Sequence, residues 1–468
     1  MRGIAELRES RRALLVGLTA ATVGIICGYD LSNIAGALLS ITDGFHLATY
    51  QQELVMTAVV IGEIGGALSG GALANAVGRK KSMMVMVAGY FAFAILGAIS
   101  VSVPMLLVAR LLLGLTIGVS MVVVPVFIAE SAPAAVRGSL LVAYQLATVV
   151  GIIIGYLAAY LLAGSQGWRW MLGLAAVPAL LVLLALRPLS DTARWHMLKG
   201  RVAQARQALQ QVEPKADVER ELAEISRALR EETGGVLAEM LRRPYLRATV
   251  FLVGLGFFVQ ITGINAIICY GPRLFEAMGF KGNFALLVLP ALVQVAALVA
   301  ICVSLVLVDR LGRRPILLSG IATMIVADVF LIAVFAVGSH SRDTLSVFGF
   351  VGVVVFVIGF TFGFGAMISV YAGESLPSRL RSLGSSAMLS ADLVANAIVA
   401  GVFLTMLHSL GGAGTFVVFG TFAVASFVFV YRVAPETKGR QLEDIRHFWE
   451  NAGRWPAGHA PVLSNARS

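Results

Sequence analysis

The stretch Glu130-Ser-Ala-Pro-Ala-Ala-Val-Arg137 occurs a second time, 244 positions later, as Glu374-Ser-Leu-Pro-Ser-Arg-Leu-Arg381. Another pair, Asn75-Ala-Val-Gly-Arg-Lys80 and Asp309-Arg-Leu-Gly-Arg-Arg314, is separated by 234 positions. Two motifs that recur in the same order at nearly the same distance indicate a chain built from two similar halves. The residues between the motifs show what kind of structure is repeated.

The composition of the 468-residue chain is that of an integral membrane protein. Hydrophobic residues make up 58% of it and charged residues only 13%, whereas soluble domains carry about 25% charged residues. A membrane-crossing helix needs roughly 20 apolar residues. Twelve such runs are present, at residues 13–38, 52–74, 82–102, 104–127, 139–163, 169–187, 246–271, 284–308, 315–338, 346–372, 383–408 and 412–433.

The distribution of positive charge predicts the orientation of these twelve helices. Of the 36 Lys and Arg residues, 31 fall in the termini and in alternate connections on one side, and four fall on the other side. Because cytoplasmic loops carry the excess of Lys and Arg, we expect both termini in the cytoplasm. The net charge of +10 is therefore a topology signal with some contact to anionic lipid, and not a nucleic-acid footprint.

The predicted fold is an all-α integral membrane protein with two six-helix halves in parallel orientation. We expect an N-terminal bundle over residues 1–187, cytoplasmic linker helices over 188–244, a C-terminal bundle over 245–433 and a cytoplasmic tail over 434–468. A flexible linker is the alternative for 188–244. Parallel repeats of this kind are an architecture of secondary transporters, with the substrate site near the membrane midplane between the halves.

Two opposite charges lie inside the predicted membrane helices. Asp30 is in the first helix and Arg110, the remaining basic residue, is in the fourth. A lone charge is costly in hydrocarbon, so each needs a partner or a cavity. We expect the two to pair in one state and separate in another, with Asp30 as a proton carrier. A purely structural ion pair is the alternative.

Other polar residues in the membrane helices are candidate substrate contacts. Asp392 and Asn396 are four residues apart and share one face of the eleventh helix. Gln145 lies in the fifth helix, and Gln260 and Asn265 lie in the seventh. Amide groups both donate and accept hydrogen bonds, which suits a neutral ligand rich in hydroxyl groups. Hydrogen bonding between helices is the alternative.

Small residues surround Glu63, another acid inside a predicted span: Gly62, Gly65, Gly66 and Ala67. Such a surface is typical of close helix packing.

At the cytoplasmic helix ends, charged and glycine residues of the repeated motifs are predicted to form a conformational latch, which closes in one state and opens in another. Its members are Gly78, Arg79, Glu130, Arg137, Asp309, Arg310, Gly312, Arg313, Arg314, Glu374 and Arg381. Simple anchoring of charges at the membrane surface is the alternative.

These motifs resemble the sugar porter branch of the major facilitator superfamily over nearly the whole chain. The resemblance rests on several blocks: Gly28-Tyr29-Asp30, Gly71 to Lys80, Arg110 with Gly114 and Gly118, Pro125 to Arg137, Asp191 to Trp195, Gln260 to Pro272, Asp309 to Arg314, and Pro435 to Gly439 with Leu442-Glu443. It implies alternating access. It also implies proton coupling by Asp30 and Arg110, and sugar contacts by Gln145, Gln260, Asn265 and Tyr270.

The chain departs from the family pattern at positions that usually contact sugar. By an ungapped count, an asparagine is replaced by Ala297 and two tryptophans by Ser369 and Leu393. The last of these follows Asp392, an additional acid. A pocket with fewer hydroxyl ligands and stacking rings should hold a pyranose less well, so a non-sugar solute is kept as the alternative.

The sequence therefore predicts a proton-coupled symporter for a monosaccharide or polyol, in the plasma membrane or a bacterial inner membrane. The alternatives are the same mechanism acting on an organic acid, a cationic or an aromatic metabolite, or acting outward, and a membrane sensor that does not transport. The six scattered His residues show no metal spacing. We expect no enzymatic activity, no cofactor and no metal. The expected partners are a small-molecule substrate, protons and the lipid bilayer, and the chain is expected to function as a monomer.

Overall fold

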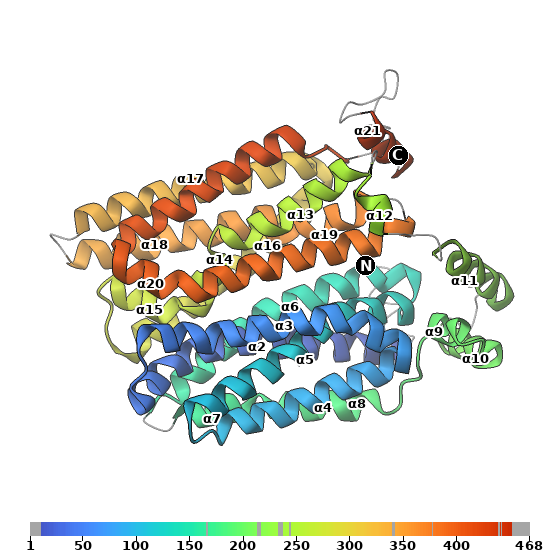
Figure 1. Ribbon diagram of the computed structural model, residues 1–468, viewed down its shortest axis with the longest axis horizontal. Helices are drawn as coiled ribbons and strands as arrows, with labels where there is room; N and C mark the ends of the chain where they lie inside the picture. Colours follow the sequence, from blue (N-terminus) through green and yellow to red (C-terminus); the bar gives the residue numbers. More distant parts are fainter. Residues whose placement is uncertain are drawn as a thin grey trace. The chain divides into compact units, whose positions relative to one another are not determined.

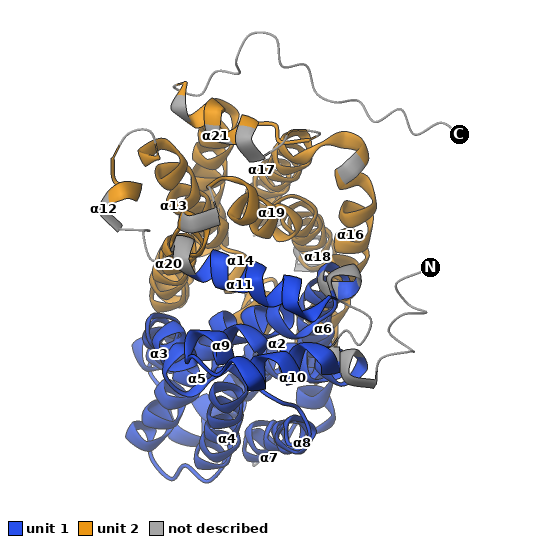
Figure 2. Cartoon of the chain, turned by 90° about the vertical axis from the view of Figure 1, so that its right-hand side faces the viewer, with its two compact units in different colours: residues 1–233 blue, residues 234–468 orange. Residues whose placement is uncertain are grey.

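Helices make up nearly all of the computed structural model, which describes residues 11–164, 167–212, 217–232, 237–242, 245–338, 342–376, 378–438, 440 and 442–451 (Figure 1). The chain divides into two compact units, Met1–Thr233 and Gly234–Ser468 (Figure 2). Within the described ranges, eleven helices are long and apolar enough to cross a membrane. The last of them, Leu380–Val433, changes direction at Gly411, whose backbone is not helical, and so provides two spans. The prediction of twelve membrane helices is confirmed.

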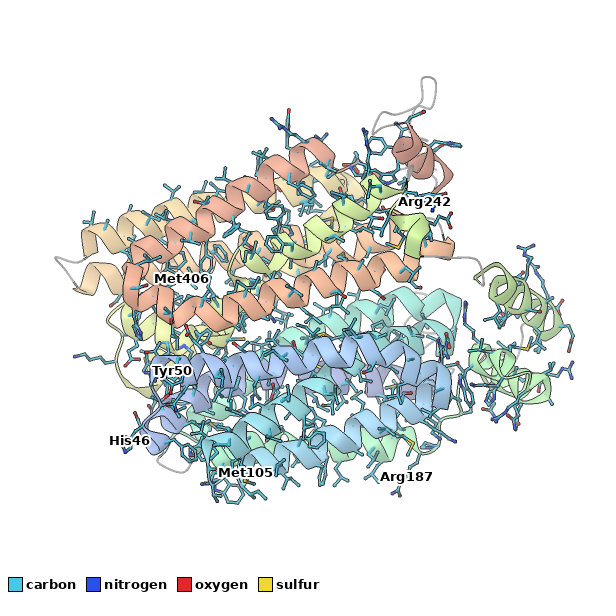
Figure 3. All side chains as sticks on the ribbon, viewed as in Figure 1. His46, Tyr50, Met105, Arg187, Arg242 and Met406 are labelled. Carbon is cyan, nitrogen blue, oxygen red and sulfur yellow. The ribbon has the colours of Figure 1, made fainter. Side chains whose placement is uncertain are left out.

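The first unit is a bundle of membrane helices followed by short polar helices. Its elements are α2 (Arg11–Phe45), α3 (Thr49–Val77), α4 (Arg79–Ala98), α5 (Val103–Ser131), α6 (Ala134–Leu161), α7 (Gly167–Leu174), α8 (Ala176–Leu186), α9 (Ala193–Leu198), α10 (Val202–Val212) and α11 (Val218–Glu232). Figure 3 shows His46, Tyr50 and Met105 toward one end of this bundle and Arg187 at the other. The helices α9 to α11 follow Arg187 and pack around a small core of Ala193, Ala205, Ala208 and Leu222.

The second unit contains two π-helices, a type of element that the described residues of the first unit do not contain. Its elements are α12 (Leu237–Met240), α13 (Leu246–Ile261), α14 (Ile264–Cys269), α15 (Gly271–Ala277), the π-helix η1 (Phe284–Val288), α16 (Leu289–Leu311), α17 (Arg313–Gly338), α18 (Arg342–Phe360), the π-helix η2 (Thr361–Gly365), α19 (Ala366–Glu374), α20 (Ser378–Val433) and α21 (Leu442–Glu450). The wider π turns are frequent at functional sites.

Glycine residues bring α3 and α5 into backbone contact. Gly62 and Gly66 face α5, and Gly114 and Gly118 face α3, so that a Cβ atom at any of the four would overlap a carbonyl oxygen of the other helix. For Gly118 that oxygen belongs to Glu63. The predicted close packing around Glu63 is thus confirmed. Because lipid tails are as apolar as leucine, such close contact is a main source of helix association in membranes.

We expect Gly114→Ala to destabilise the protein, because its new Cβ would meet the carbonyl oxygen of Val59 and push α3 away from α5. Overpacking of this kind costs about 1–3 kcal/mol, and the midpoint of thermal unfolding in detergent should fall by several degrees. Gly71→Ala is the matched control, because no atom lies within 4 Å of its Cβ position. Equal midpoints for the two variants would contradict the packing argument.

Candidate functional site

An ion pair lies in the interior of the first unit. The Nη1 atom of Arg110, on α5, donates a hydrogen bond of 2.8 Å to Oδ1 of Asp30, on α2. Both side chains are only 3% exposed. Burying two charges is stable only when each offsets the desolvation of the other, so removing either charge leaves the other uncompensated.

Two neighbours of Asp30 on α2 fix the rotation of this helix. The hydroxyl of Tyr29 and the Nδ2 atom of Asn33 both donate to the carbonyl oxygen of Met171, on α7, over 2.9 and 2.8 Å. These two side chains are buried. Because α2 is held at this point, the carboxylate of Asp30 is directed consistently toward α5.

A break in the seventh membrane helix carries the predicted amide residues of the second unit. α13 ends at Ile261, Gly263 adopts a left-handed backbone with φ of 98°, and α14 begins at Ile264. Gln260 and Asn265 stand on either side of this break and are partly exposed. Discontinuous helices of this kind form substrate sites in secondary transporters, because the interruption presents backbone and side-chain polar groups to a cavity.

Polar side chains of α13 and α20 meet next to this break. The Nε2 atom of Gln260 lies 3.3 Å from Oδ2 of Asp392 and donates to it. The other amide atom of Gln260, Oε1, is buried and has no hydrogen-bond partner among the described residues. Asn396 follows Asp392 by one helix turn and is 5% exposed. The pair therefore contains a carboxylate and an amide oxygen that both have unused capacity to accept hydrogen bonds.

The two remaining predicted substrate contacts have different surroundings. Gln145 is partly exposed on α6, in the first unit. Tyr270 is fully buried, its hydroxyl donates to the carbonyl oxygen of Ala400 over 2.6 Å, and its ring stacks on Phe403. This hydroxyl is used to hold α20, so the role of Tyr270 as a substrate contact stays a prediction.

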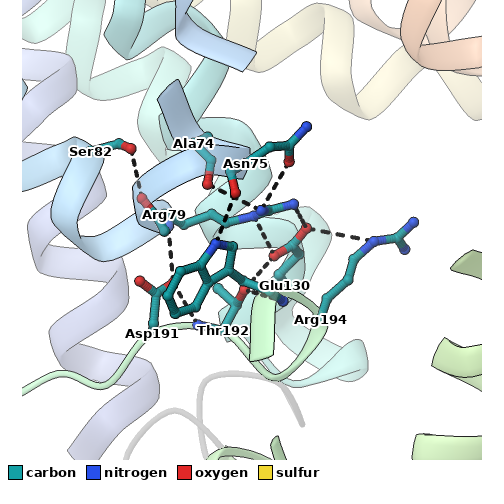
Figure 4. A network of polar contacts seen from close by, with 10 residues as sticks. Ala74, Asn75, Arg79, Ser82, Glu130, Asp191, Thr192 and Arg194 are labelled. Atoms are coloured by element: carbon teal, nitrogen blue, oxygen red, sulfur yellow. Dashed lines mark hydrogen bonds and ion pairs between the residues drawn. The ribbon is translucent and has the colours of Figure 1, made fainter. Parts of the chain in front are cut away.

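Arg79 and Glu130 form the centre of a polar network at the end of the first unit that also carries Arg187 (Figure 4). The Nε atom of Arg79 lies 3.0 Å from Oε2 of Glu130, and its Nη2 donates to Oε1 over 3.1 Å. Glu130 also accepts a hydrogen bond from the Thr192 hydroxyl, 2.5 Å away, and pairs with Arg194 at 3.7 Å. The network thereby links α3, α4 and α5 to α9.

Asp191 completes this network by capping the start of α4. Its Oδ1 accepts hydrogen bonds of 2.9 Å from the backbone N–H groups of Arg79 and Thr192. The turn into α4 is made by Gly78, whose φ of 106° disfavours any other residue. A carboxylate at the first turn of a helix satisfies unpaired N–H groups and interacts favourably with the helix dipole.

The second unit repeats this arrangement with Glu436 in place of Asp191. Gly312 has a φ of 97°, and the carboxylate of Glu436 accepts hydrogen bonds of 3.1 Å from the backbone N–H groups of Arg313 and Arg314. The Nη2 atom of Arg313 lies 3.8 Å from Oε1 of Glu374. The cap is thus similar in both units, whereas the arginine–glutamate contact is longer in the second.

The other predicted latch residues are only partly accounted for. The carbonyl oxygen of Arg310 accepts a hydrogen bond from Nζ of Lys438. Arg381 is described and its Nε has no hydrogen-bond partner among the described residues. The side chains of Arg137 and Asp309 lie outside the described residues.

The two capping acids were not among the predicted latch residues. Asp191-Thr192 and Glu436-Thr437 are a third repeated pair, 245 positions apart, and each follows the last membrane helix of its half. This spacing agrees with that of the other two repeats, and it could have identified the two capping acids from the sequence. A match of two residues is weak evidence for a repeat by itself. The hydrogen bonds that both carboxylates make at the start of a helix show that the two positions correspond.

Comparison with known proteins places these features in a family. Residues 16–449 match the family model described as "Sugar (and other) transporter". The chain is 33% identical to the galactose-proton symporter of Escherichia coli strain K12, over 91% of this chain and 92% of that protein. It is 32% identical to the arabinose-proton symporter of the same strain, with 94% of each covered. The names denote transporters, not enzymes.

The solved structures agree with this assignment. The structure of the proton:xylose symporter XylE of E. coli with bound 6-bromo-6-deoxy-D-glucose superimposes with a TM-score of 0.77 at 25% identity. The match covers 94% of this chain and 99% of that one. The chain is accordingly a multi-pass membrane protein.

We expect Glu130→Gln to loosen α9, because the charge that holds Arg79 and Arg194 is lost while the side-chain shape is kept. Breaking a largely buried ion pair is destabilising, and amide hydrogen exchange over residues 193–198 should become at least about tenfold faster. Glu224→Gln is the control, because its ion pair with Arg220 is exposed and contributes little. Unchanged exchange in Glu130→Gln would show that the network does not hold α9.

Proposed function

This chain belongs to the sugar porter family of the major facilitator superfamily, and on that premise we propose that it couples transport of a small polyhydroxylated solute, a monosaccharide or polyol, to proton movement by alternating access. The observation that carries the proposal is the buried ion pair of Asp30 and Arg110. The relatives named as proton symporters for galactose and arabinose support it.

Asp30 is assigned the role of proton carrier. When its carboxylate takes up a proton, the attraction to Arg110 is lost and the buried guanidinium becomes uncompensated. The protein then favours a conformation in which Arg110 finds another partner or water. Because the proton and the conformation affect one another by linkage, proton entry can drive the conformational cycle.

Substrate binding is assigned to Gln145, Gln260, Asn265, Tyr270, Asp392 and Asn396. The contact of Gln260 with Asp392 supports this assignment, because it leaves acceptor atoms that sugar hydroxyls satisfy by donation. A hydrogen bond to a charged acceptor is worth about 1.5–3 kcal/mol, more than a bond between neutral groups. Such bonds give affinity without a stacking tryptophan.

The latch residues are assigned the role of stabilising one conformation of the cycle. Each unit holds its own helix ends together through a capped Gly-Arg turn and an arginine–glutamate contact. We assign both termini to the cytoplasm, in a plasma membrane or a bacterial inner membrane, and a monomer as the working unit in the lipid bilayer.

A second candidate function keeps the mechanism and changes the solute to a cationic metabolite. The carboxylate of Asp392 beside Gln260 favours it. Leu393, which is buried where the family pattern has a tryptophan, leaves a sugar ring without a stacking surface there. Direct pairing with a cation would then replace hydroxyl binding at this carboxylate.

We expect Asp30→Asn to abolish accumulation of solute against its gradient while exchange of internal for external solute continues. The amide keeps the shape of the side chain but does not take up or release a proton during the cycle. The measurement is uptake into proteoliposomes under an inward proton gradient, with labelled pentoses, hexoses and polyols. Asp43→Asn, an exposed change on the same helix, serves as control. Normal accumulation by Asp30→Asn would overturn the proton-carrier assignment.

We expect Asp392→Asn to raise KM for the transported sugar roughly tenfold with little change in kcat, because it weakens a charge-assisted bond made to bound substrate. Ser390→Ala, on the same helix, should leave KM unchanged. Uptake of an organic cation by the unmodified protein, absent in Asp392→Asn, would favour the second function. An unaltered KM for every solute would remove Asp392 from the binding site.

A further inference from the structure

A cleft of about 480 Å³ lies in the first unit beside the polar network described above, between the start of α4 and the helices α9 and α10. This volume is within the range of small-molecule sites, about 300–1,000 Å³. Lys80, Lys81 and Met84 of α4 form one wall, and residues of α10 form the opposite wall. The cleft is distinct from the membrane helices that carry Asp30 and Asp392.

The charge of the cleft is predominantly positive. Lys80, Lys81 and Arg201 line it, and Lys81 and Arg201 are exposed. Among the described residues that line it, Asp191 is the one acid, and it already accepts two backbone hydrogen bonds. Burial lowers the pKa of His196, so its imidazole is neutral at neutral pH and the positive charge comes from the lysines and the arginine.

Amide side chains of α10 lie opposite Lys80 and Lys81 of α4. Gln204, Gln207 and Gln211 of α10 line the cleft and, at spacings of three and four residues, share one face of the helix. Amides bind hydroxyl groups as both donors and acceptors, whereas lysine and arginine bind phosphate by charge-assisted hydrogen bonds. The combination matches a ligand that carries both groups.

We propose that this cleft binds a phosphate ester whose organic part carries hydroxyl groups. Two sources have this chemistry. One is a free phosphorylated sugar, the product of a kinase-type reaction on a sugar in the cytoplasm. The other is the glycerol-phosphate headgroup of an anionic phospholipid, which reaches the cleft from the membrane surface beside Lys81 and Met84.

Occupancy of the cleft bears directly on the polar network. Asp191 faces the cleft and caps α4, and Trp195 lines the cleft while its Nε1 donates to the carbonyl oxygen of Asn75, at the end of α3. A ligand that bridges α4 and α10 therefore stabilises the arrangement in which α9 is attached to α3 and α4. The cleft is thus a regulatory site, and its binding is measurable without transport.

The experiment measures binding to the full-length protein in nanodiscs of phosphatidylcholine, by calorimetric titration with glucose 6-phosphate, with glucose and inorganic phosphate as separate probes. In a second arm, nanodiscs contain increasing phosphatidylglycerol, and protection of residues 193–211 from amide exchange is followed. The double variant Lys81→Gln with Arg201→Gln removes two exposed cations, and Lys199→Gln, an exposed cation that does not line the cleft, is the control.

Saturable binding of glucose 6-phosphate, weakened at least about tenfold in the double variant and unchanged in Lys199→Gln, identifies the free ester as ligand. Protection by phosphatidylglycerol alone, lost in the double variant, identifies the lipid headgroup. Binding that is absent in both arms, or equal in the double variant and the control, overturns the proposal. Inorganic phosphate binding as tightly as the ester would overturn the part assigned to the glutamines. None of these outcomes depends on whether the protein transports sugar.

Discussion

The hydrogen bond between Arg110 and Asp30 joins two opposite charges in the interior of the first unit, and the proposed function depends on it. In hydrocarbon neither charge is tolerated alone, so the sequence can retain each only because the other is 2.8 Å away. The same dependence makes the pair responsive. A proton on the carboxylate would leave the guanidinium uncompensated, which is the physical basis of the proton-carrier role proposed for Asp30.

Placing the two charges in contact requires the helices that carry them to be closely packed and fixed in rotation. Gly114 and Gly118 let α5 approach α3 to backbone contact, and Asn33 anchors α2 on α7. These residues carry no charge. They nevertheless determine the geometry of the ion pair, because a shift of one ångström at a buried contact exceeds the tolerance of a hydrogen bond.

Much of this fold could be predicted from the sequence, because length and hydrophobicity define membrane helices almost independently of tertiary structure. The repeated motifs likewise identified the two halves. The contact of Gln260 with Asp392 could not be predicted, because it joins residues 132 positions apart. Nor could the occupied hydroxyl of Tyr270, since pattern matching assigns a side chain to a site without showing which backbone group it already binds.

The caps at Asp191 and Glu436 show that the two halves share one way of stabilising the start of a membrane helix, although their surroundings differ. Each carboxylate satisfies the N–H groups at the start of a membrane helix that follows a glycine with positive φ. In the first unit the capping acid leads directly into α9, and so it joins the membrane bundle to a basic cleft. In the second it is followed by Lys438, which binds the carbonyl oxygen of Arg310. A strictly symmetric transporter would sense its surroundings equally through both halves. Asp191, the capping acid of the first half, also lines the cleft, so the ligand proposed there would contact the first half of the repeat next to its cap.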